Sequence, residues 1–344
     1  MAVPMSREKP APKPGRLDAK PIAVAKAAGK TNKIADSLVK CEVNLEKGKW
    51  ASPEPCAVFL IDSEAKFPEI IYRIETDDPG PYEWTWSISW EVKACPQNKK
   101  SARFKAKHAK TFFASGKGDS TTKEWNATLN GKVLGGLLTV SCKTPTLTFV
   151  RKTIINGQQT DKEHVLAELL QYEKDFPEDV KLARLIFEQG SRFLHFYPDN
   201  QPLVSFDNGY GLGQATDPTP SFEEVWHWKK HVAYIVKAVI PSKRKEAKKY
   251  LSPHPFTTEE LNMETLVYYN GANAHYLVWD EKEKKWIKNL DVLCDPTQSN
   301  KGWDLTDDKN ANKTLEQLRD NKGAKPKYTG RCYAEHIKNH GGKL

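Results

Sequence analysis

The stretch EWTWSISWEVKA, residues 83–94, constrains the fold more than any other part of the chain. Its large apolar side chains alternate with polar ones, so that an extended strand presents Trp84, Trp86, Ile88, Trp90 and Val92 on one face. Such a face needs a second layer that buries it. We therefore expect the three tryptophans in a core between two sheets, although stacking on sugar rings is an alternative use for them.

Similar strand patterns recur between residues 38 and 150. The further expected strands cover residues 57–63, 69–76, 102–109, 124–131 and 135–143, and clusters of Pro, Gly, Asn and Asp separate them. Short strands at this spacing are typical of a β-sandwich. We predict an Ig-like β-sandwich over residues 38–150 that serves in binding, spacing or delivery and contains no catalytic groups.

The positive charge of the chain is concentrated near its start. Residues 1–40 hold nine Lys and Arg against three Asp and Glu, which gives +6 of the net +9. This Pro-, Ala- and Lys-rich segment predicts a disordered basic tail over residues 1–37, suited to anionic polymers such as cell walls. Because no zinc-finger spacing, RNP-like run or P-loop occurs, we expect no nucleic-acid partner. The sequence also contains no long apolar run, which predicts no membrane span and no classical signal peptide.

The six cysteines occur as four in the first half and two near the end: Cys41, Cys56, Cys95, Cys142, Cys294 and Cys332. None forms a CxxC pair, which argues against zinc ligation. The even split favours one or two disulfides in the first half and a Cys294–Cys332 bridge, formed in an oxidising compartment. Buried free thiols are the alternative.

From Thr160 the apolar periodicity becomes helical, which predicts a second domain over residues 155–344. A capping box is expected at Thr160–Glu163, another at Ser221–Glu224, and Pro177 should begin a buried helix. Glu188 ends that helix. Its apolar surroundings and the negative end of the helix dipole would both favour a protonated carboxyl, the form that glycosidic cleavage needs.

The segments EQGSRF at 188–193, DNGYGLGQ at 207–214 and YYNG at 268–271 resemble three ordered motifs of the lysozyme-like superfamily, in particular lytic transglycosylases and goose-type lysozymes. The resemblance covers about 165–275. It implies an α+β multidomain protein in which a mainly α-helical lysozyme-like catalytic domain follows the sandwich. The catalytic residue implied is Glu188, and the substrate-binding residues implied are Ser191, Tyr210, Gln214, Tyr269 and Asn270. No cofactor or metal is implied.

The chain departs from the family pattern in three places. Gln189 and Gly190 separate Glu188 from the serine that usually follows the acid directly, and Gly213 replaces the usual methionine, which should loosen the substrate groove. The third departure concerns the second carboxylate of goose-type enzymes. Its matching positions hold Ser205 and Thr216, with acids displaced to Asp207 and Asp217.

A single acid favours the lytic transglycosylase route over hydrolysis, because an inverting hydrolase needs a second carboxylate as its base. The resemblance thus implies cleavage of peptidoglycan between N-acetylmuramic acid and N-acetylglucosamine, with Glu188 as acid and then base. One alternative is an inverting muramidase with Asp207 or Asp217 as base. Another, from a different functional class, is a noncatalytic glycan-binding protein.

The expected partner is peptidoglycan in the periplasm or cell wall of a target bacterium. Without a classical signal peptide, the chain would act as a secreted antibacterial effector or a phage-type lysin, or leave the cell by non-classical export. An effector would have a cognate immunity protein and a secretion-apparatus component as further partners. His227 and His231 have the spacing of a metal-binding pair, but no third ligand is evident, so we expect structural or surface roles for both and a packing role for His195.

Overall fold

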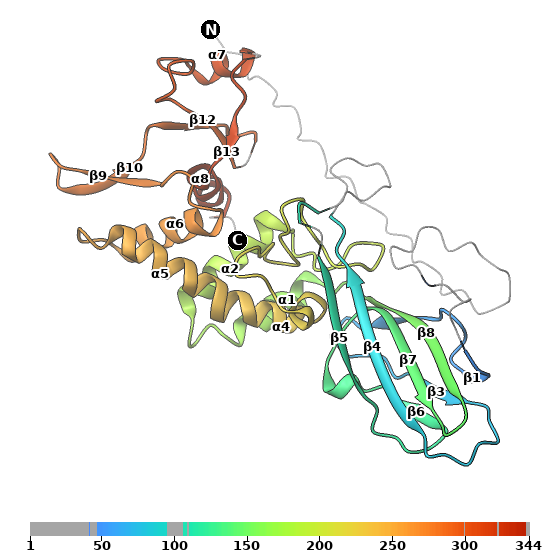
Figure 1. Ribbon diagram of the computed structural model, residues 1–344. Helices are drawn as coiled ribbons and strands as arrows, with labels where there is room; N and C mark the ends of the chain where they lie inside the picture. Colours follow the sequence, from blue (N-terminus) through green and yellow to red (C-terminus); the bar gives the residue numbers. More distant parts are fainter. Residues whose placement is uncertain are drawn as a thin grey trace, which may run out of the picture. The chain divides into compact units, whose positions relative to one another are not determined.

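The computed structural model describes residues 41, 47–94, 106–108, 110–298, 300–321 and 323–341. All of these residues belong to one compact unit that spans residues 38–344. The unit is a mixed α+β structure in which strands precede a group of helices, and a smaller mixed segment follows them (Figure 1). The basic tail predicted for residues 1–37 lies outside the described residues.

The larger sheet has five strands in the order β2-β8-β7-β4-β5. They are β2 (Val58–Ile61), β8 (Thr148–Gly157), β7 (Gly136–Lys143), β4 (Glu83–Glu91) and β5 (Thr111–Lys117). Strand β2 runs parallel to β8, and every other pair is antiparallel. A second sheet has the order β1-β3-β6 and comprises β1 (Trp50–Ser52), β3 (Ile71–Ile74) and β6 (Glu124–Asn126).

The tryptophan face of β4 is buried, which confirms the expectation from its period of two. Trp84, Trp86 and Trp90 are each at most 3% exposed. The second sheet contributes Tyr72 and Trp125 to the same core, and the rings of Trp84 and Trp125 lie 6.0 Å apart. Trp84 therefore packs between the two sheets, Trp90 packs against Trp226, and none of the three tryptophans is displayed for sugar stacking.

The expected strands agree with the structure except in four respects. The strand expected at 124–131 is confirmed only over Glu124–Asn126, and Leu129–Gly131 forms a short 3-10 helix. The strand expected at 102–109 is not found in residues 106–108, and the rest of that segment lies outside the described residues. Strands β1, β5 and β8 were not expected from the pattern, and β8 continues to Gly157, beyond the predicted end of the sandwich at residue 150.

The helical part comprises α1 (Lys162–Leu170), α2 (Pro177–Gly190), α3 (Phe222–Trp226), α4 (Trp228–Tyr234), α5 (Ile240–Leu251) and α6 (Thr258–Tyr269). Pro177 occupies the first turn of α2, and Ser221 forms the expected capping box. The expected capping box at Thr160 is wrong. Asp161 is the N-cap of α1, and its side chain makes no capping hydrogen bond.

Helices α4 and α5 join through a π-helical turn, Ile235–Val239, just before Pro241. Proline has no amide hydrogen and its ring collides with the preceding helical turn, so a regular α-helix cannot pass through it unchanged. Widening the turn accommodates the proline. It also places Ile235 beside the glycine-rich hairpin described below.

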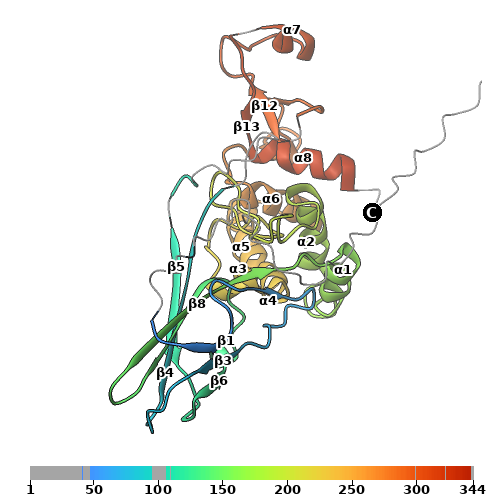
Figure 2. The ribbon, with the colours of Figure 1, turned by 90° about the vertical axis from the view of Figure 1, so that its right-hand side faces the viewer.

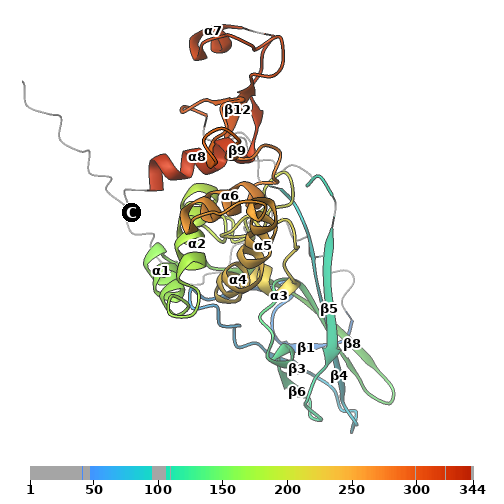
Figure 3. The ribbon, with the colours of Figure 1, turned by 90° about the vertical axis from the view of Figure 1, so that its left-hand side faces the viewer.

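The sheet and the helices share one apolar cluster, so they do not form two domains joined by a linker alone. Trp90 of β4 meets Trp226 of α3 edge to face with ring centroids 5.4 Å apart. The Trp90 indole donates to Gln201 at 3.0 Å, and the Trp228 indole donates to the backbone of Ser63 at 2.8 Å. Figures 2 and 3 show α3 and α4 next to the strands from opposite sides.

Residues 277–341 form what we call the C-terminal lobe. It consists of a charged hairpin of β9 (Leu277–Asp280) and β10 (Lys285–Lys288), a sheet of β11 (Val292–Cys294), β12 (Lys301–Asp304) and β13 (Lys327–Tyr328), and helices α7 (Leu315–Asp320) and α8 (Gly330–Gly341). Within the described part of the chain, every helix is too short or too polar to cross a lipid bilayer.

Two disulfides are present among the described residues. The predicted Cys294–Cys332 bridge is confirmed, and Cys41–Cys56 is the bridge of the first half. Cys142 is a buried free thiol in β7, and Cys95 lies outside the described residues.

Candidate functional site

The candidate acid, Glu188, lies in the last turn of α2. After Gly190 the chain reverses sharply because Arg192 and Phe193 both adopt positive φ angles, 55° and 60°. The Ser191 hydroxyl donates to the backbone oxygen of Phe187 at 3.1 Å, and the residue is only 6% exposed. Ser191 therefore closes its own helix, and the predicted substrate contact at Ser191 is not supported.

The surroundings of Glu188 differ from those expected. Its carboxylate accepts a hydrogen bond from Lys162 Nζ at 2.8 Å, and the Glu188 side chain is 44% exposed. Lys162 comes from the first turn of α1 and also lies 4.6 Å above the ring of Phe193. The expected apolar environment is thus wrong. The carboxylate is half-exposed and its charge is partly balanced by an ammonium group.

The motif DNGYGLGQ, residues 207–214, forms a tight hairpin. Tyr210 bridges Val204 on one side and Ala215 on the other. Glycine is required at two positions: a Cβ on Gly209 would lie 2.6 Å from the backbone oxygen of Gln214, and Gly211 combines a φ of 58° with the His195 ring 2.7 Å away. Both contacts are too close for any side chain.

Tyr210 points away from the surface of this hairpin. It is 1% exposed, and its ring packs edge to face against Phe112 of β5 with centroids 5.7 Å apart. The predicted substrate contact at Tyr210 is therefore not supported, because the side chain anchors the hairpin to the sheet.

The peptide groups of Gly213 are held from both sides by side chains of two helices. Its N–H donates to His231 Nε2 of α4 at 3.2 Å, and its carbonyl oxygen accepts from the Tyr269 hydroxyl of α6 at 2.5 Å. A Cβ at Gly213 would lie 2.5 Å from Cδ1 of Ile235. There is no room for the methionine usual in the family, so glycine tightens this position, contrary to the expected loosening of the groove.

Gln214, at the tip of the hairpin, lies next to the end of α2. Its φ is 49°, and its amide donates to the Gly211 oxygen at 2.8 Å. A Cβ on Gly190 would be 3.5 Å from Cγ of Gln214. The structure thus brings together the Glu188 turn, Gln214 and the Gly213–Tyr269 contact, three segments that are far apart in the sequence.

The buried histidines support this arrangement in their neutral form. His231 accepts from Gly213 through Nε2 and donates from Nδ1 to the Glu224 oxygen at 3.1 Å. Burial lowers the pKa of His231 to about 4 and that of His195 well below its usual range, and the two rings are 5.0 Å apart. Among the described residues, no group of three or more His, Cys, Asp or Glu could hold a metal ion.

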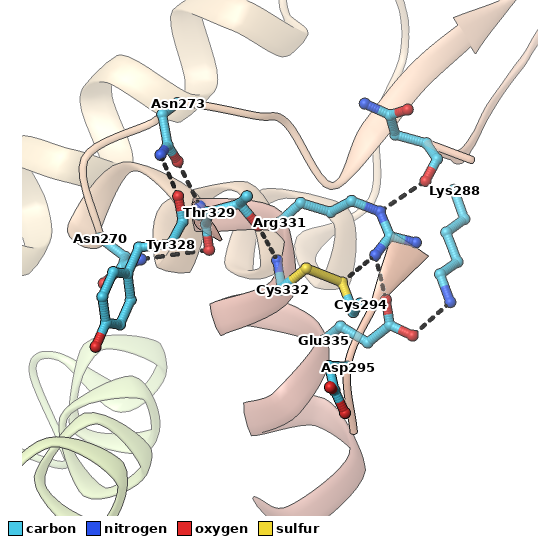
Figure 4. Close-up of a disulfide and its surroundings, with 12 residues drawn as sticks. Asn270, Asn273, Lys288, Cys294, Asp295, Tyr328, Thr329, Arg331, Cys332 and Glu335 are labelled. Atoms are coloured by element: carbon cyan, nitrogen blue, oxygen red, sulfur yellow. Dashed lines mark hydrogen bonds and ion pairs between the residues drawn. A yellow bond between two sulfur atoms is a disulfide. The ribbon is translucent and has the colours of Figure 1, made fainter. Parts of the chain in front are cut away.

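The remaining predicted site residues are occupied elsewhere. Asp207 is exposed and accepts from the Ser205 hydroxyl, while Asp217 is 86% exposed and pairs with Lys243 at 3.3 Å. Among the described residues, no hydrogen bond or ion pair joins either aspartate to the Glu188 side chain. Asn270 caps α6, and its amide donates to the Thr329 oxygen at 3.4 Å, which ties α6 to the start of α8 (Figure 4).

Two contributors to the site were not expected from the sequence. Lys162 meets Glu188 across 26 residues of chain, and no local pattern indicates such a pair. Gln159 accepts the backbone N–H groups of His195 and Phe196, each at 2.8 Å, and so fixes the loop that follows α2. Gln159 lies just before α1, and Lys162 lies in its first turn. This position at the start of a helix is the only signal in the sequence that could have indicated a structural role for them.

Comparison of the chain with protein-family models, curated proteins and solved structures finds no match. The fold class is therefore given by the structure alone: a mixed α+β unit with several sheets.

Proposed function

We propose that this protein cleaves peptidoglycan glycan strands between N-acetylmuramic acid and N-acetylglucosamine, as a lytic transglycosylase with a lysozyme-like helical domain and an Ig-like sandwich. The observation that carries the proposal is the convergence at one place of the Glu188 turn, the Gly213–Gln214 hairpin tip and Tyr269. The half-exposed Glu188 carboxylate and the partly exposed Gln214 amide lie on neighbouring turns, and a carboxyl group near an amide that can hydrogen-bond a hydroxyl suits a sugar chain.

In this mechanism Glu188, protonated, gives its proton to the oxygen that bridges the two sugars. The bond from C1 of N-acetylmuramic acid to that oxygen breaks, and the N-acetylglucosamine-containing half leaves with a new hydroxyl. The Glu188 carboxylate then takes the proton of the C6 hydroxyl while this oxygen bonds to C1 and closes a 1,6-anhydro ring. Glu188 ends as it began, and no water is consumed.

Lys162 gives the resting site a defined starting geometry. It holds the Glu188 carboxylate by a charge-assisted hydrogen bond in the free protein. A bound glycan would displace water from this half-exposed carboxyl, and exclusion of water favours the neutral form that the first step needs. The ammonium group is then available to a substrate hydroxyl or acetamido oxygen.

The single-acid route is favoured over an inverting hydrolase because both candidate bases are engaged away from the carboxyl. Asp207 accepts from Ser205, and Asp217 pairs with Lys243. A noncatalytic glycan-binding protein is the second candidate, and the observation that favours it is the Lys162–Glu188 ion pair, which stabilises a charged carboxylate.

The test compares wild type with Glu188→Gln on purified peptidoglycan, with products identified by mass. We expect the variant to be slower by about 10² to 10⁴, the usual cost of losing a general acid. Its Tm should be unchanged or slightly lower, because only a partly exposed ion pair with Lys162 is weakened. The matched control is Glu173→Gln, an exposed glutamate in the turn after α1, which should cleave like wild type.

The product masses separate the alternatives. Anhydro products support the transglycosylase, whereas products heavier by one water would favour a muramidase with Asp207 or Asp217 as base. Wild type that binds glycan without releasing any product would identify a binding protein. Glu188→Gln at wild-type rate would contradict the whole assignment.

The proposed setting is that of an antibacterial effector or phage-type lysin acting in the periplasm or cell wall, with the sandwich as the delivery module. Wild type directed to the periplasm of a test bacterium should lyse it, and the same chain kept in the cytoplasm should not. Periplasmic Glu188→Gln should be harmless. Equal toxicity of wild type from both compartments would contradict a peptidoglycan target. A periplasmic immunity protein should bind the chain and suppress lysis.

A further inference from the structure

The C-terminal lobe contains a cavity of about 580 Å³, distant in sequence from the residues of the proposed catalytic site. We call it the C-terminal cavity. Its apolar lining comes from Trp303 of β12, Leu318 of α7 and Ala324, each at most 8% exposed. Its polar lining includes Arg319 and Lys325. An apolar floor with a few convergent polar groups is the usual composition of a ligand site.

The guanidinium of Arg319 is held in a fixed orientation. Its Nε and Nη2 donate to the carboxylate of Asp295 at 3.3 Å and 2.5 Å. The Asp295 side chain is fully buried and also accepts from the backbone N–H and hydroxyl of Thr297 and from the Gln298 amide. These donors hold the pKa of Asp295 well below its usual range. The aspartate is therefore a charged, fully bonded support for Arg319.

The polar lining includes cationic groups whose hydrogen-bond donors are available to a ligand. Arg319 Nη1 has no hydrogen-bond partner among the described residues, and the Arg319 side chain is 36% exposed. Lys325 is exposed and forms no ion pair in the described part of the chain. Because the charge of Asp295 is already matched by Arg319, the ammonium group of Lys325 makes the cavity cationic.

The disulfide fixes the support of this cavity. Cys294 immediately precedes Asp295 and is bonded to Cys332 of α8, as Figure 4 shows. Strand β12 passes directly over this bridge, since a Cβ on Gly302 would lie 2.6 Å from the Cys332 sulfur. Trp303 follows Gly302 and donates its indole N–H to the Ala324 oxygen at 2.6 Å. The apolar floor and the Asp295–Arg319 pair are therefore rigidly connected.

We propose that the C-terminal cavity binds the terminal carboxylate of a peptide, with Arg319 Nη1 and Lys325 as its donors and a small apolar side chain of the peptide on Ala324 and Pro326. One free guanidinium nitrogen and one ammonium match the two oxygens of a carboxylate. Identifying the peptide as the stem of peptidoglycan, which ends in a carboxylate beside an alanine methyl, rests on the proposed function. The cavity would then hold the cell wall while the Glu188 site acts on the glycan.

The experiment titrates full-length wild type with acetyl-lysyl-D-alanyl-D-alanine, as the free acid and as the C-terminal amide, by calorimetry. We expect saturable binding of the acid with a Kd below about 10 mM, and binding of the amide weaker by at least about fivefold. Lys325→Gln and Arg319→Lys should each weaken binding of the acid by a similar factor. The matched control Lys282→Gln, an exposed lysine in the β9–β10 turn, should bind like wild type.

Lys325→Gln keeps the argument testable if Arg319→Lys unfolds, because Lys325 is exposed and supports no buried charge. The proposal is overturned by absence of saturable binding, by equal binding of acid and amide, by unchanged binding in Lys325→Gln, or by inorganic phosphate binding more tightly than the peptide. The peptide contains no glycan, so this result is independent of catalysis. Peptide binding without glycan cleavage would refute the proposed function alone, and cleavage without peptide binding would refute this inference alone.

Discussion

Acid should destabilise the protein through His231, which must stay neutral to accept the N–H of Gly213. Burial lowers the pKa of His231 from 6.5 to about 4 in the folded protein. Between these two pH values the unfolded state binds the proton and the folded state does not. The contribution of neutral His231 to the free energy of unfolding is therefore fully present above about pH 6.5, and it is lost as the pH is lowered towards 4.

The size of this effect follows from the shift. At about 1.4 kcal/mol per pH unit, lowering the pKa by roughly 2.5 corresponds to about 3 kcal/mol of the free energy of unfolding. Because His231 is fully buried, water does not screen this effect. The pKa of His195 is lowered for the same reason and adds to the loss in the same direction. Such a loss is a large part of the 5–15 kcal/mol that stabilises a typical domain.

The assay is denaturant unfolding followed by tryptophan fluorescence at pH 7.5, 6.5, 5.5 and 4.5 for wild type and His231→Gln. Glutamine offers an amide acceptor and donor in place of the imidazole but does not titrate, so its pH dependence should be shallower by about 2–3 kcal/mol over this range. The control is His340→Gln, at an exposed position near the end of α8. Identical pH dependence in wild type and His231→Gln would refute the reasoning.

Three further perturbations test the contacts that hold Gly213 in the hairpin and the disulfide of the C-terminal lobe. Gly213→Met should cost about 1–3 kcal/mol and lower glycan cleavage, because its Cβ would lie 2.5 Å from Ile235 Cδ1; a stability equal to wild type in thermal unfolding would contradict this. Tyr269→Phe removes the donor to the Gly213 oxygen and should lower the free energy of unfolding by about 1 kcal/mol and also lower the rate of cleavage. Unchanged cleavage of peptidoglycan would mean that Tyr269 does not position the hairpin. Reducing Cys294–Cys332, which closes a separation of 38 residues, should lower stability by roughly 4 kcal/mol, seen as a lower Tm in a dithiol reductant than in the oxidised protein, whereas equal Tm values would show that the lobe is held without it.

Local spacing in the sequence determined those elements whose burial depends only on their own pattern. The period of two in β4 fixed which face carries the tryptophans, and the structure buries that face. Pro177 and the Ser221 capping box fixed where two helices begin, because they act on the orphan N–H groups of the first turn. Strand β5 escaped detection because Phe112 and Phe113 are adjacent, one buried and the other 65% exposed, which breaks the alternation.

Only the tertiary structure decided what surrounds each candidate site residue. The sequence placed Glu188 at the end of an apolar helix, but the carboxylate points to a partner that another helix supplies, Lys162. Tyr210 was predicted to meet a substrate and instead packs against Phe112, about a hundred residues earlier in the chain. The physical reason is that exposure, ion pairing and the fit at Gly213 depend on atoms from distant segments. A sequence pattern sets the direction of a side chain along its own element, whereas the packing of elements against one another sets what that side chain meets.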